Sequence, residues 1–78
     1  MATVRLFAAA REAAGVARDV IDASTVAGLL AAARDRYGPA FAAVLETSKV
    51  WVNGEPASAG TSIGPRDEVA ILPPVSGG

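Results

Sequence analysis

Cysteine and histidine are both absent from this sequence of 78 residues. Without cysteine, the chain forms no disulfide and offers neither a thiolate metal ligand nor a thiol nucleophile. Without histidine, it lacks the commonest general base and the Ser-His and Cys-His arrangements of nucleophilic catalysis. The carboxylates that remain form no suggestive cluster along the sequence. We therefore expect no metal site and little chemistry from the side chains.

Basic residues are also scarce, because seven arginines and lysines stand against eight acidic residues and Lys49 is the only lysine. No basic run with interleaved aromatic residues is present, which argues against nucleic acid as a partner. No apolar stretch approaches the roughly 20 residues of a membrane span, and no charged-then-apolar signal opens the sequence. These absences predict a cytoplasmic protein that binds neither nucleic acid nor a membrane.

The composition is typical of one small globular domain. Hydrophobic residues make up 51% of the chain and charged residues 19%. A domain of this length buries only roughly 60% of its unfolded surface, which leaves no room for both a stable core and a deep substrate pocket. Because the hydrophobicity is high for so small a protein, we expect apolar surface outside the core, which favours a protein partner.

Residue periodicity predicts five strands and one main helix. The strands are expected at residues 3–8, 17–21, 49–52, 55–58 and 68–72. Apolar residues at spacings of three and four predict an amphipathic helix over residues 26–37, with Ser24 or Thr25 as its N-cap. Shorter helical turns are expected at residues 9–14 and 41–45.

Glycine and proline mark the ends of these elements. Gly15 closes the first helical turn, and Gly38 with the following proline stops the main helix. Asn53-Gly54 is a strong hairpin signal, and Pro56 limits the return strand to a short edge. The economical architecture for this order is an α+β roll, a mixed sheet packed on one side by the main helix.

Strand alternation divides the apolar side chains between the two faces of the sheet. The face toward the helix is expected to carry Val4, Leu6, Val50, Val52, Val69 and Ile71, and the other face Phe7, Trp51, Ala70 and Leu72. We predict that Phe7 and Leu72 form an exposed binding patch. Trp51 fits a buried position equally well, because a register slip of one residue would turn it inward. At the second strand, Arg18 and Asp19 are expected to mark a solvated edge.

The end of the sequence carries the strongest functional signal. Pro73 and Pro74 have no backbone N–H, so the last strand cannot extend through them, and they favour a stiff, extended path off the sheet. We therefore divide the chain into a domain over residues 1–74 and a flexible tail over residues 75–78. Fully extended, this tail spans about 13 Å.

Gly77 and Gly78 have no side chains and can thread a channel too narrow for a Cβ atom, which suits a carboxylate delivered into another protein's active site. A carboxylate is a poor electrophile, but its acyl-adenylate is a good target for a persulfide or a lysine amine. The sequence has no phosphate-cradling glycine loop, so we expect no bound cofactor and an ATP-dependent activating enzyme. A frayed, inert terminus is the alternative.

Two segments resemble the ubiquitin-like sulfur-carrier family (MoaD/ThiS), and within it the MoaD type, the small subunit of molybdopterin synthase. The segment LFAAAREAAG (residues 6–15) resembles the family pattern Phe-Ala-x-x-Arg-Glu-x-x-Gly. The segment DEVAILPPVSGG (residues 67–78) resembles its Glu-Val-Ala-x-x-Pro-Pro-Val-(Ser/Thr)-Gly-Gly end. The middle of the chain is similar only in pattern. The resemblance implies a β-grasp (ubiquitin-like) fold, which agrees with the predicted element order.

The resemblance also implies a mechanism and partners. A MoeB-type activating enzyme adenylates Gly78, and a persulfide donor converts the adenylate to a thiocarboxylate. The tail then inserts into a MoaE-type large subunit, where sulfur passes to cyclic pyranopterin monophosphate in molybdenum cofactor biosynthesis. A cysteine persulfide on this chain is excluded, so any sulfur is carried on the C-terminus.

In the family, the tail and the adjacent apolar face contact both partners. This implies partner-binding roles for Phe7, Leu72, Pro73, Pro74, Val75 and Ser76. Arg11 and Glu12 match the family motif, and a structural or a partner-contacting role is open for each of them. Trp51 stands where the family often has an aliphatic or small residue, so its place in the interface is open too.

Three other functions remain open. The first is a sulfur carrier for thiamine or cysteine biosynthesis, although the Arg11-Glu12 motif and the Pro73-Pro74 pair argue against the thiamine type. The second is a protein modifier joined to its target through an isopeptide bond, since adenylation is common to both. The third is a binding module with an inert tail.

Overall fold

The fold is described from a computed structural model, which covers residues 1–74. The predicted roles of Val75, Ser76, Gly77 and Gly78 lie outside these described residues.

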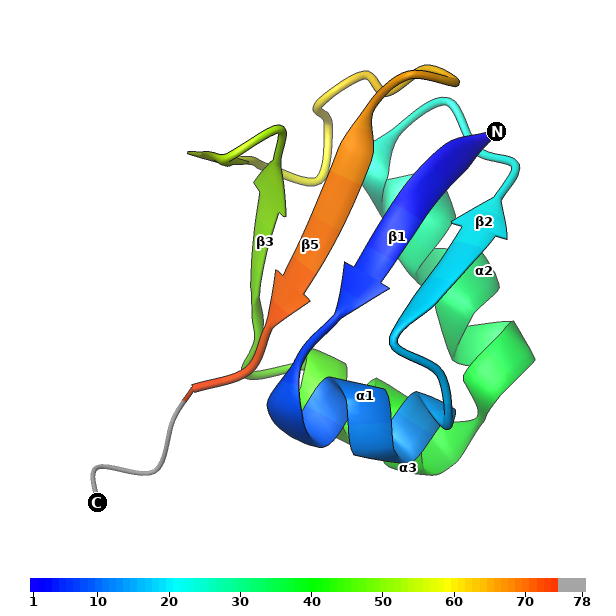
Figure 1. The fold of residues 1–78 in the computed structure, drawn as a ribbon, viewed down its shortest axis with the longest axis vertical. Coiled ribbons are helices and arrows are strands. Elements are labelled where there is room, and N and C mark those ends of the chain that lie inside the picture. The colour runs from blue at the N-terminus through cyan, green and yellow to red at the C-terminus, as the bar shows by residue number, and fades with distance from the viewer. Residues whose placement is uncertain (75–78) are drawn as a thin grey trace.

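Five strands form one mixed sheet in the order β2-β1-β5-β3-β4 (Figure 1). They are β1 (Ala2–Leu6), β2 (Arg18–Ile21), β3 (Lys49–Val52), β4 (Glu55–Pro56) and β5 (Glu68–Leu72). β1 and β5 run parallel at the centre of the sheet, and the other neighbouring pairs are antiparallel. The mixed sheet of the predicted α+β roll is therefore confirmed.

Of the three helices, the longest lies behind the sheet, and the two shorter ones lie at the end of the sheet where β1 and β5 finish (Figure 1). The three are α1 (Ala8–Ala14), α2 (Val26–Tyr37) and α3 (Pro39–Leu45). α2 is the main helix, and α1 and α3 pack on each other near the ends of β1 and β5. None of the helices in the described part of the chain is long and apolar enough to cross a membrane.

The core lies between the helices and the inner face of the sheet. Its largest fully buried side chains are Phe41, Leu6, Ile21, Leu29, Ile71, Val4, Val26 and Val69. Each such side chain stabilises the fold by about 1.5–3 kcal/mol relative to an exposed position. Val50 and Val52 point to the same side but are half-buried, because their strand lies next to the short β4 at the edge. The predicted inward face of the sheet is thus confirmed.

Local hydrogen bonds explain where the helices begin and end. Thr25, rather than Ser24, is the N-cap of α2, and its Oγ1 accepts from the Gly28 N–H at 3.1 Å. Gly15 ends α1 with a φ of 80°, in the left-handed region that favours glycine. α3 begins at Pro39, in the first turn, where a backbone N–H has no acceptor within the helix, so the missing N–H of proline loses no helical hydrogen bond.

Two strands end earlier than predicted. β1 ends at Leu6 because Ala8 has a φ of 49° and the Phe7 carbonyl accepts from the Ala10 N–H at 3.0 Å, which starts α1. The return strand, expected over residues 55–58, stops at Pro56. The Ala57 N–H still donates to the Val50 carbonyl at 3.0 Å, but the Ser58 N–H donates to Thr61 Oγ1 at 3.1 Å in a local turn that leads the chain away from β3. Both differences arise where local turn chemistry overrides the alternating pattern.

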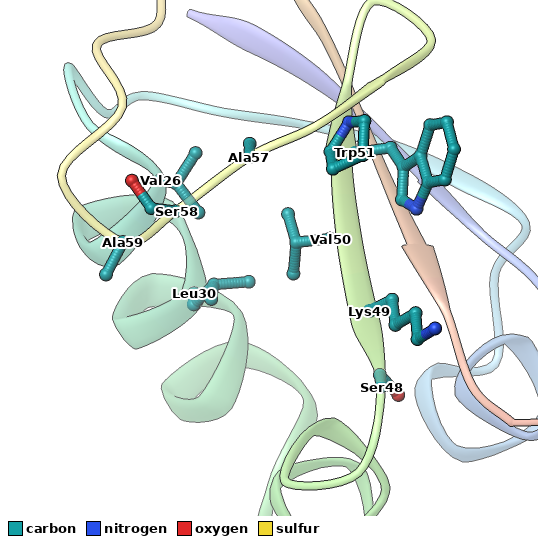
Figure 2. A pocket seen from close by; sticks show the side chains of 10 residues that line it. Val26, Leu30, Ser48, Lys49, Val50, Trp51, Ala57, Ser58 and Ala59 are labelled. Atoms are coloured by element: carbon teal, nitrogen blue, oxygen red, sulfur yellow. The ribbon is translucent and has the colours of Figure 1, made fainter.

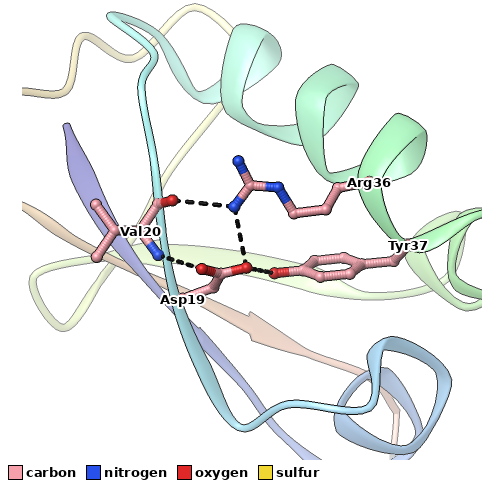
Figure 3. A network of polar contacts seen from close by, with 4 residues as sticks. All are labelled: Asp19, Val20, Arg36 and Tyr37. Atoms are coloured by element: carbon pink, nitrogen blue, oxygen red, sulfur yellow. Dashed lines mark hydrogen bonds and ion pairs between the residues drawn. The ribbon is translucent and has the colours of Figure 1, made fainter.

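The prediction that Arg18 and Asp19 mark an edge of the sheet is confirmed, because β2 is an edge strand and Arg18 is exposed, but Asp19 is half-buried rather than fully solvated. Asp19 pairs with Val4 across β1 and β2, so its half-buried side chain lies on the helix side of the sheet. There it accepts from the Tyr37 hydroxyl at 2.5 Å and from Arg36 Nη1 at 3.0 Å (Figure 3). The Asp19 carboxylate therefore links the edge strand β2 to the last turn of α2 through hydrogen bonds.

Candidate functional site

The face of the sheet away from the helices carries the predicted partner-binding residues. The strand register places Arg5 opposite Ala70, Ala70 opposite Trp51, and Leu72 opposite Lys49. Directly opposed residues share a face, so these side chains form one surface. We call this surface the open face and define it by Arg5, Phe7, Lys49, Trp51, Ala70 and Leu72.

Phe7 is exposed on this surface, as predicted, with 37% of its area accessible. Its ring lies beside the Arg5 guanidinium, whose Cζ is 5.5 Å from the ring centroid, a cation–π geometry. Arg5 Nη1 also lies 3.6 Å from Glu68 Oε1. Arg5 thus contacts both an aromatic ring and a carboxylate on this surface.

Trp51 and Leu72 border a shallow groove on the open face. The groove has a volume of ≈ 430 Å³ and is lined by Thr47, Lys49, Trp51, Leu72, Pro73 and Pro74. Trp51 and Leu72 are both half-buried, so Trp51 is not part of the core and Leu72 is less exposed than predicted. Their apolar surfaces and a single lysine make this groove suited to a protein partner with apolar anchors.

The chain leaves the sheet at this groove. β5 ends at Leu72, Pro73 is half-buried against the groove, and Pro74 is exposed. In Figure 1 this segment runs past the end of β3 and away from the helices. The predicted path off the sheet is therefore seen as far as Pro74, and residues 75–78 lie outside the described part.

Arg11 and Glu12 are exposed on α1, apart from the groove. Within residues 1–74, neither side chain has a hydrogen-bond or ion-pair partner. The backbone carbonyl of Arg11 accepts from the Gly15 N–H at 2.9 Å and so closes the helix. The spacing from Arg11 to Gly15 in the motif thus has a structural reason, while the two charged side chains remain free to contact a partner.

The polar groups that the sequence analysis missed are structural and lie away from the open face. Hydrogen bonds from Tyr37, the Val20 N–H and Arg36 lower the pKa of Asp19 from its ordinary value of 3.8. Burial, followed by the hydrogen bond to Asp19, raises the pKa of Tyr37 to about 12. The signal for this cluster was present, because Asp19 is in phase with the buried Ile21 two residues later.

A second polar cluster joins the hairpin to the start of β5. Asn53 Nδ2 donates to Asp67 Oδ1 at 2.9 Å, and the Gly64 N–H donates to Asp67 Oδ2 at 2.8 Å. These two hydrogen bonds lower the pKa of Asp67. Among residues 1–74, no group of three acidic, cysteine or histidine side chains could hold a metal ion.

The sequence profile of the ThiS family matches residues 4–78. No curated protein matches the chain significantly. Among solved structures, small archaeal modifier protein 1 (SAMP1) of Haloferax volcanii is 34% identical with a TM-score of 0.81, covering 99% of this chain and 98% of that one. SAMP1 of Methanosarcina acetivorans is 30% identical with a TM-score of 0.88, covering 99% and 95%.

A further solved structure agrees on the fold. The putative molybdopterin converting factor subunit 1 of Pyrococcus furiosus is 24% identical with a TM-score of 0.80, covering 95% of this chain and 97% of that one. At this identity the likeness bears on the fold alone, and it matches the mixed sheet and the helices described above.

Proposed function

The chain belongs to the ThiS family of ubiquitin-like β-grasp proteins, and from this premise we propose that Gly78 carries sulfur as a C-terminal thiocarboxylate. Proteins of this family are small carriers or modifiers that are not themselves catalytic. The role proposed for this chain is that of a substrate for its partner enzymes, which agrees with the absence of cysteine and histidine from the sequence.

One observation carries this proposal. The central strand β5 leads directly into Pro73 and Pro74, beside an apolar groove, and the family profile continues from there to residue 78. A partner that binds the open face would therefore also contact Pro73 and Pro74, the segment that leads to the two glycines. Because glycine has no side chain, the last residues can enter a narrow active site.

The proposed chemistry needs an activating enzyme, ATP and a sulfur donor. The Gly78 carboxylate attacks ATP, which gives the acyl-adenylate and pyrophosphate. A persulfide then attacks the acyl carbon and AMP leaves, which gives an acyl disulfide. Cleavage of its S–S bond by a second thiol releases the thiocarboxylate and leaves a disulfide on the donor. Nothing in this sequence of steps requires a catalytic side chain from the carrier.

For the pathway, we propose the molybdopterin synthase small subunit, a cytoplasmic protein that works with a MoeB-type activating enzyme and a MoaE-type large subunit. The terminal segment DEVAILPPVSGG and the Arg11-Glu12 motif support this choice over a thiamine-type carrier. In this role the thiocarboxylate donates its sulfur to cyclic pyranopterin monophosphate.

Intact-mass spectrometry tests the carrier function. The purified chain is incubated with ATP, a MoeB-type enzyme and a sulfide source, and a mass gain equal to one oxygen replaced by sulfur is expected on Gly78. Addition of a MoaE-type subunit and the pyranopterin substrate then tests the pathway. If an activating enzyme shown to be active on its own carrier produces no such mass gain, the proposal is wrong.

A modifier function is the second candidate, and one observation favours it. The two small archaeal modifier proteins share 34% and 30% of residues with this chain. Adenylation of Gly78 would then be followed by attack of a lysine amine and formation of an isopeptide bond. Immunoblots of cell extracts would show the chain in conjugates of higher mass, which a dedicated sulfur carrier does not form.

A further inference from the structure

The two edges of the sheet are closed in different ways. Beside β3, the chain itself covers the edge, because the Ala57 N–H donates to the Val50 carbonyl at 3.0 Å. Figure 2 shows this segment crossing from β3 to α2, with Ala57 near the strand and Ala59 near the helix. At the other end of the sheet lies β2, and no backbone segment of residues 1–74 pairs with its outer side. An exposed strand edge of this kind is a template for pairing with another chain unless something blocks it.

The register of β1 and β2 shows which backbone groups point to this outer side. The Leu6 N–H donates to the Ala17 carbonyl at 2.9 Å, just before the first residue of β2. Along an antiparallel ladder, hydrogen-bonded pairs alternate with pairs that exchange no hydrogen bond. Arg18 and Val20 belong to the second kind, so their N–H and C=O groups point away from β1.

Two side chains occupy the outer backbone groups of Val20. Its N–H donates to Asp19 Oδ1 at 2.8 Å, and its carbonyl accepts from Arg36 Nη1 at 3.0 Å (Figure 3). Arg36 Nη1 also donates to Asp19 Oδ2 at 3.0 Å, so the two side chains hold each other in place. We call this arrangement the β2 cap and define it by Asp19 and Arg36. The cap fills the position that the backbone of a neighbouring strand would take.

Beneath the cap, the sequence of β2 is complementary to a second copy of itself. Val20 is 43% exposed, Arg18 is exposed, and Asp22, two residues after Val20, has a side chain that is 90% exposed. Residues two apart in an extended strand share a face. In an antiparallel pairing centred on Val20, the two valines meet, and each Arg18 lies opposite an Asp22 of the other copy. Such a pairing places an apolar contact between two ion pairs, and both kinds of cross-strand contact are favourable.

The charges at both ends of this strand lack strong partners within residues 1–74. Arg18 lies opposite Arg5, and like charges directly opposite each other are unfavourable. Arg5 has Glu68 at 3.6 Å, whereas no carboxylate of the described residues lies within ion-pair distance of Arg18. Asp22 lies 4.0 Å from the N-terminal amine, and this pair is so exposed that it contributes little. Pairing with a second copy would give Arg18 and Asp22 the partners that the single chain does not.

We propose that β2 is a latent interface for a second copy of this chain and that the β2 cap keeps it closed. With the cap in place, the chain does not associate through this edge. When Asp19 and Arg36 release Val20, two copies pair through β2 in the register centred on Val20 and form one continuous sheet. The groove beside Pro73 and Pro74 lies at the other side of β1 and β5, so the proposal is independent of sulfur transfer.

Analytical ultracentrifugation over a range of protein concentrations tests the cap. The unchanged protein should sediment as a monomer, and the double variant Asp19→Ala, Arg36→Leu should shift to twice the monomer mass as its concentration rises. Arg36→Leu alone retains the hydrogen bond between Asp19 and Tyr37 and should associate more weakly than the double variant. Circular dichroism shows whether each variant is folded, and if the double variant is not, the single variant decides the test.

Charge reversal then tests the register. In the double variant, Arg18→Glu should abolish association, because it places two carboxylates opposite each other, and a further Asp22→Arg change should restore it.

Arg34→Leu is the matched control, because it removes an exposed arginine from the same helix whose side chain has no hydrogen-bond or ion-pair partner within residues 1–74. This variant should remain monomeric. Three results would each overturn the proposal. They are dimers of the unchanged protein that Arg18→Glu dissociates, folded cap variants that stay monomeric at every concentration, and association of the cap variants that does not respond to the charges at residues 18 and 22.

Discussion

At the scale of single residues, the two sides of the sheet use polar and aromatic side chains for opposite purposes. On the helix side, Asp19 binds Tyr37 and Arg36 and holds β2 against α2. On the open face, Arg5 lies beside the Phe7 ring and leaves its surface accessible. The first arrangement stabilises the fold, and the second leaves an aromatic surface exposed.

Asp19 predicts a pH dependence of stability. Its folded-state pKa is lowered below the ordinary 3.8, so its contribution is present above that value and is lost as the pH falls through the folded-state pKa. At pH 7, Asp19→Asn should lower the free energy of unfolding by about 1–2 kcal/mol. Urea unfolding at a series of pH values should show this difference shrinking in acid. A difference that stays constant down to the acid limit would contradict the prediction.

Phe7 predicts a binding effect without a folding effect. Because its side chain is exposed, Phe7→Ala should weaken binding of the activating enzyme or large subunit by about 2 kcal/mol and leave the melting temperature nearly unchanged. Calorimetric titration and thermal unfolding measure the two quantities. Val20→Ala is a suitable control, since Val20 is 43% exposed but lies on the edge strand β2. A large loss of stability in Phe7→Ala would instead make Phe7 a core residue.

At the scale of elements, the hairpin between β3 and β4 shows that the residues of a turn determine where two strands end and how they are joined to the rest of the sheet. Asn53 has a φ of 51° and Gly54 a φ of 82°, as the primed two-residue turn of a hairpin requires. Asn53 also accepts from the Glu68 N–H at 2.9 Å, so one side chain forms the turn and joins it to β5. Replacement of Asn53 would therefore loosen two connections at once.

The cap of α2 gives a prediction at this scale. Thr25→Ala removes the acceptor for the Gly28 N–H and should cost about 1 kcal/mol of unfolding free energy. Thr25→Ser retains a hydroxyl and should restore most of that loss. Denaturant unfolding of the three proteins makes the comparison. Equal stability of the alanine and serine variants would show that the cap hydrogen bond contributes nothing measurable.

The same elements show what a sequence can and cannot predict. The main helix, the hairpin and the last strand follow from periodicity and from residues such as Gly38 and Asn53, which act locally. The inward position of Asp19 depends on Tyr37, 18 residues away. The half-burial of Leu72 depends on its place in the groove beside Trp51, which only the pairing of β3 with β5 creates. Local signals were therefore sufficient for the elements, and long-range contacts decided the site.

At the scale of the whole molecule, the tail and the domain are expected to be separable in function. Deletion of Gly78, or addition of one residue after it, should abolish sulfur transfer and leave the fold intact, because neither change touches residues 1–74. Mass spectrometry after activation measures transfer, and circular dichroism measures the fold. Normal transfer by either variant would show that the reacting carboxylate is not that of Gly78.

The central pairing of β1 with β5 has a consequence for synthesis of the protein. It pairs Thr3 with Glu68 and Leu6 with Ile71. The first strand to be synthesised therefore cannot form its central pairing until the last strand has left the ribosome. A nascent chain that lacks β5 has two unpaired strand edges, those of β1 and β3, at what should be its centre. Translation that stops early therefore yields an unfolded product for proteolysis. A partner that recognises the closed sheet meets only chains whose synthesis has passed β5.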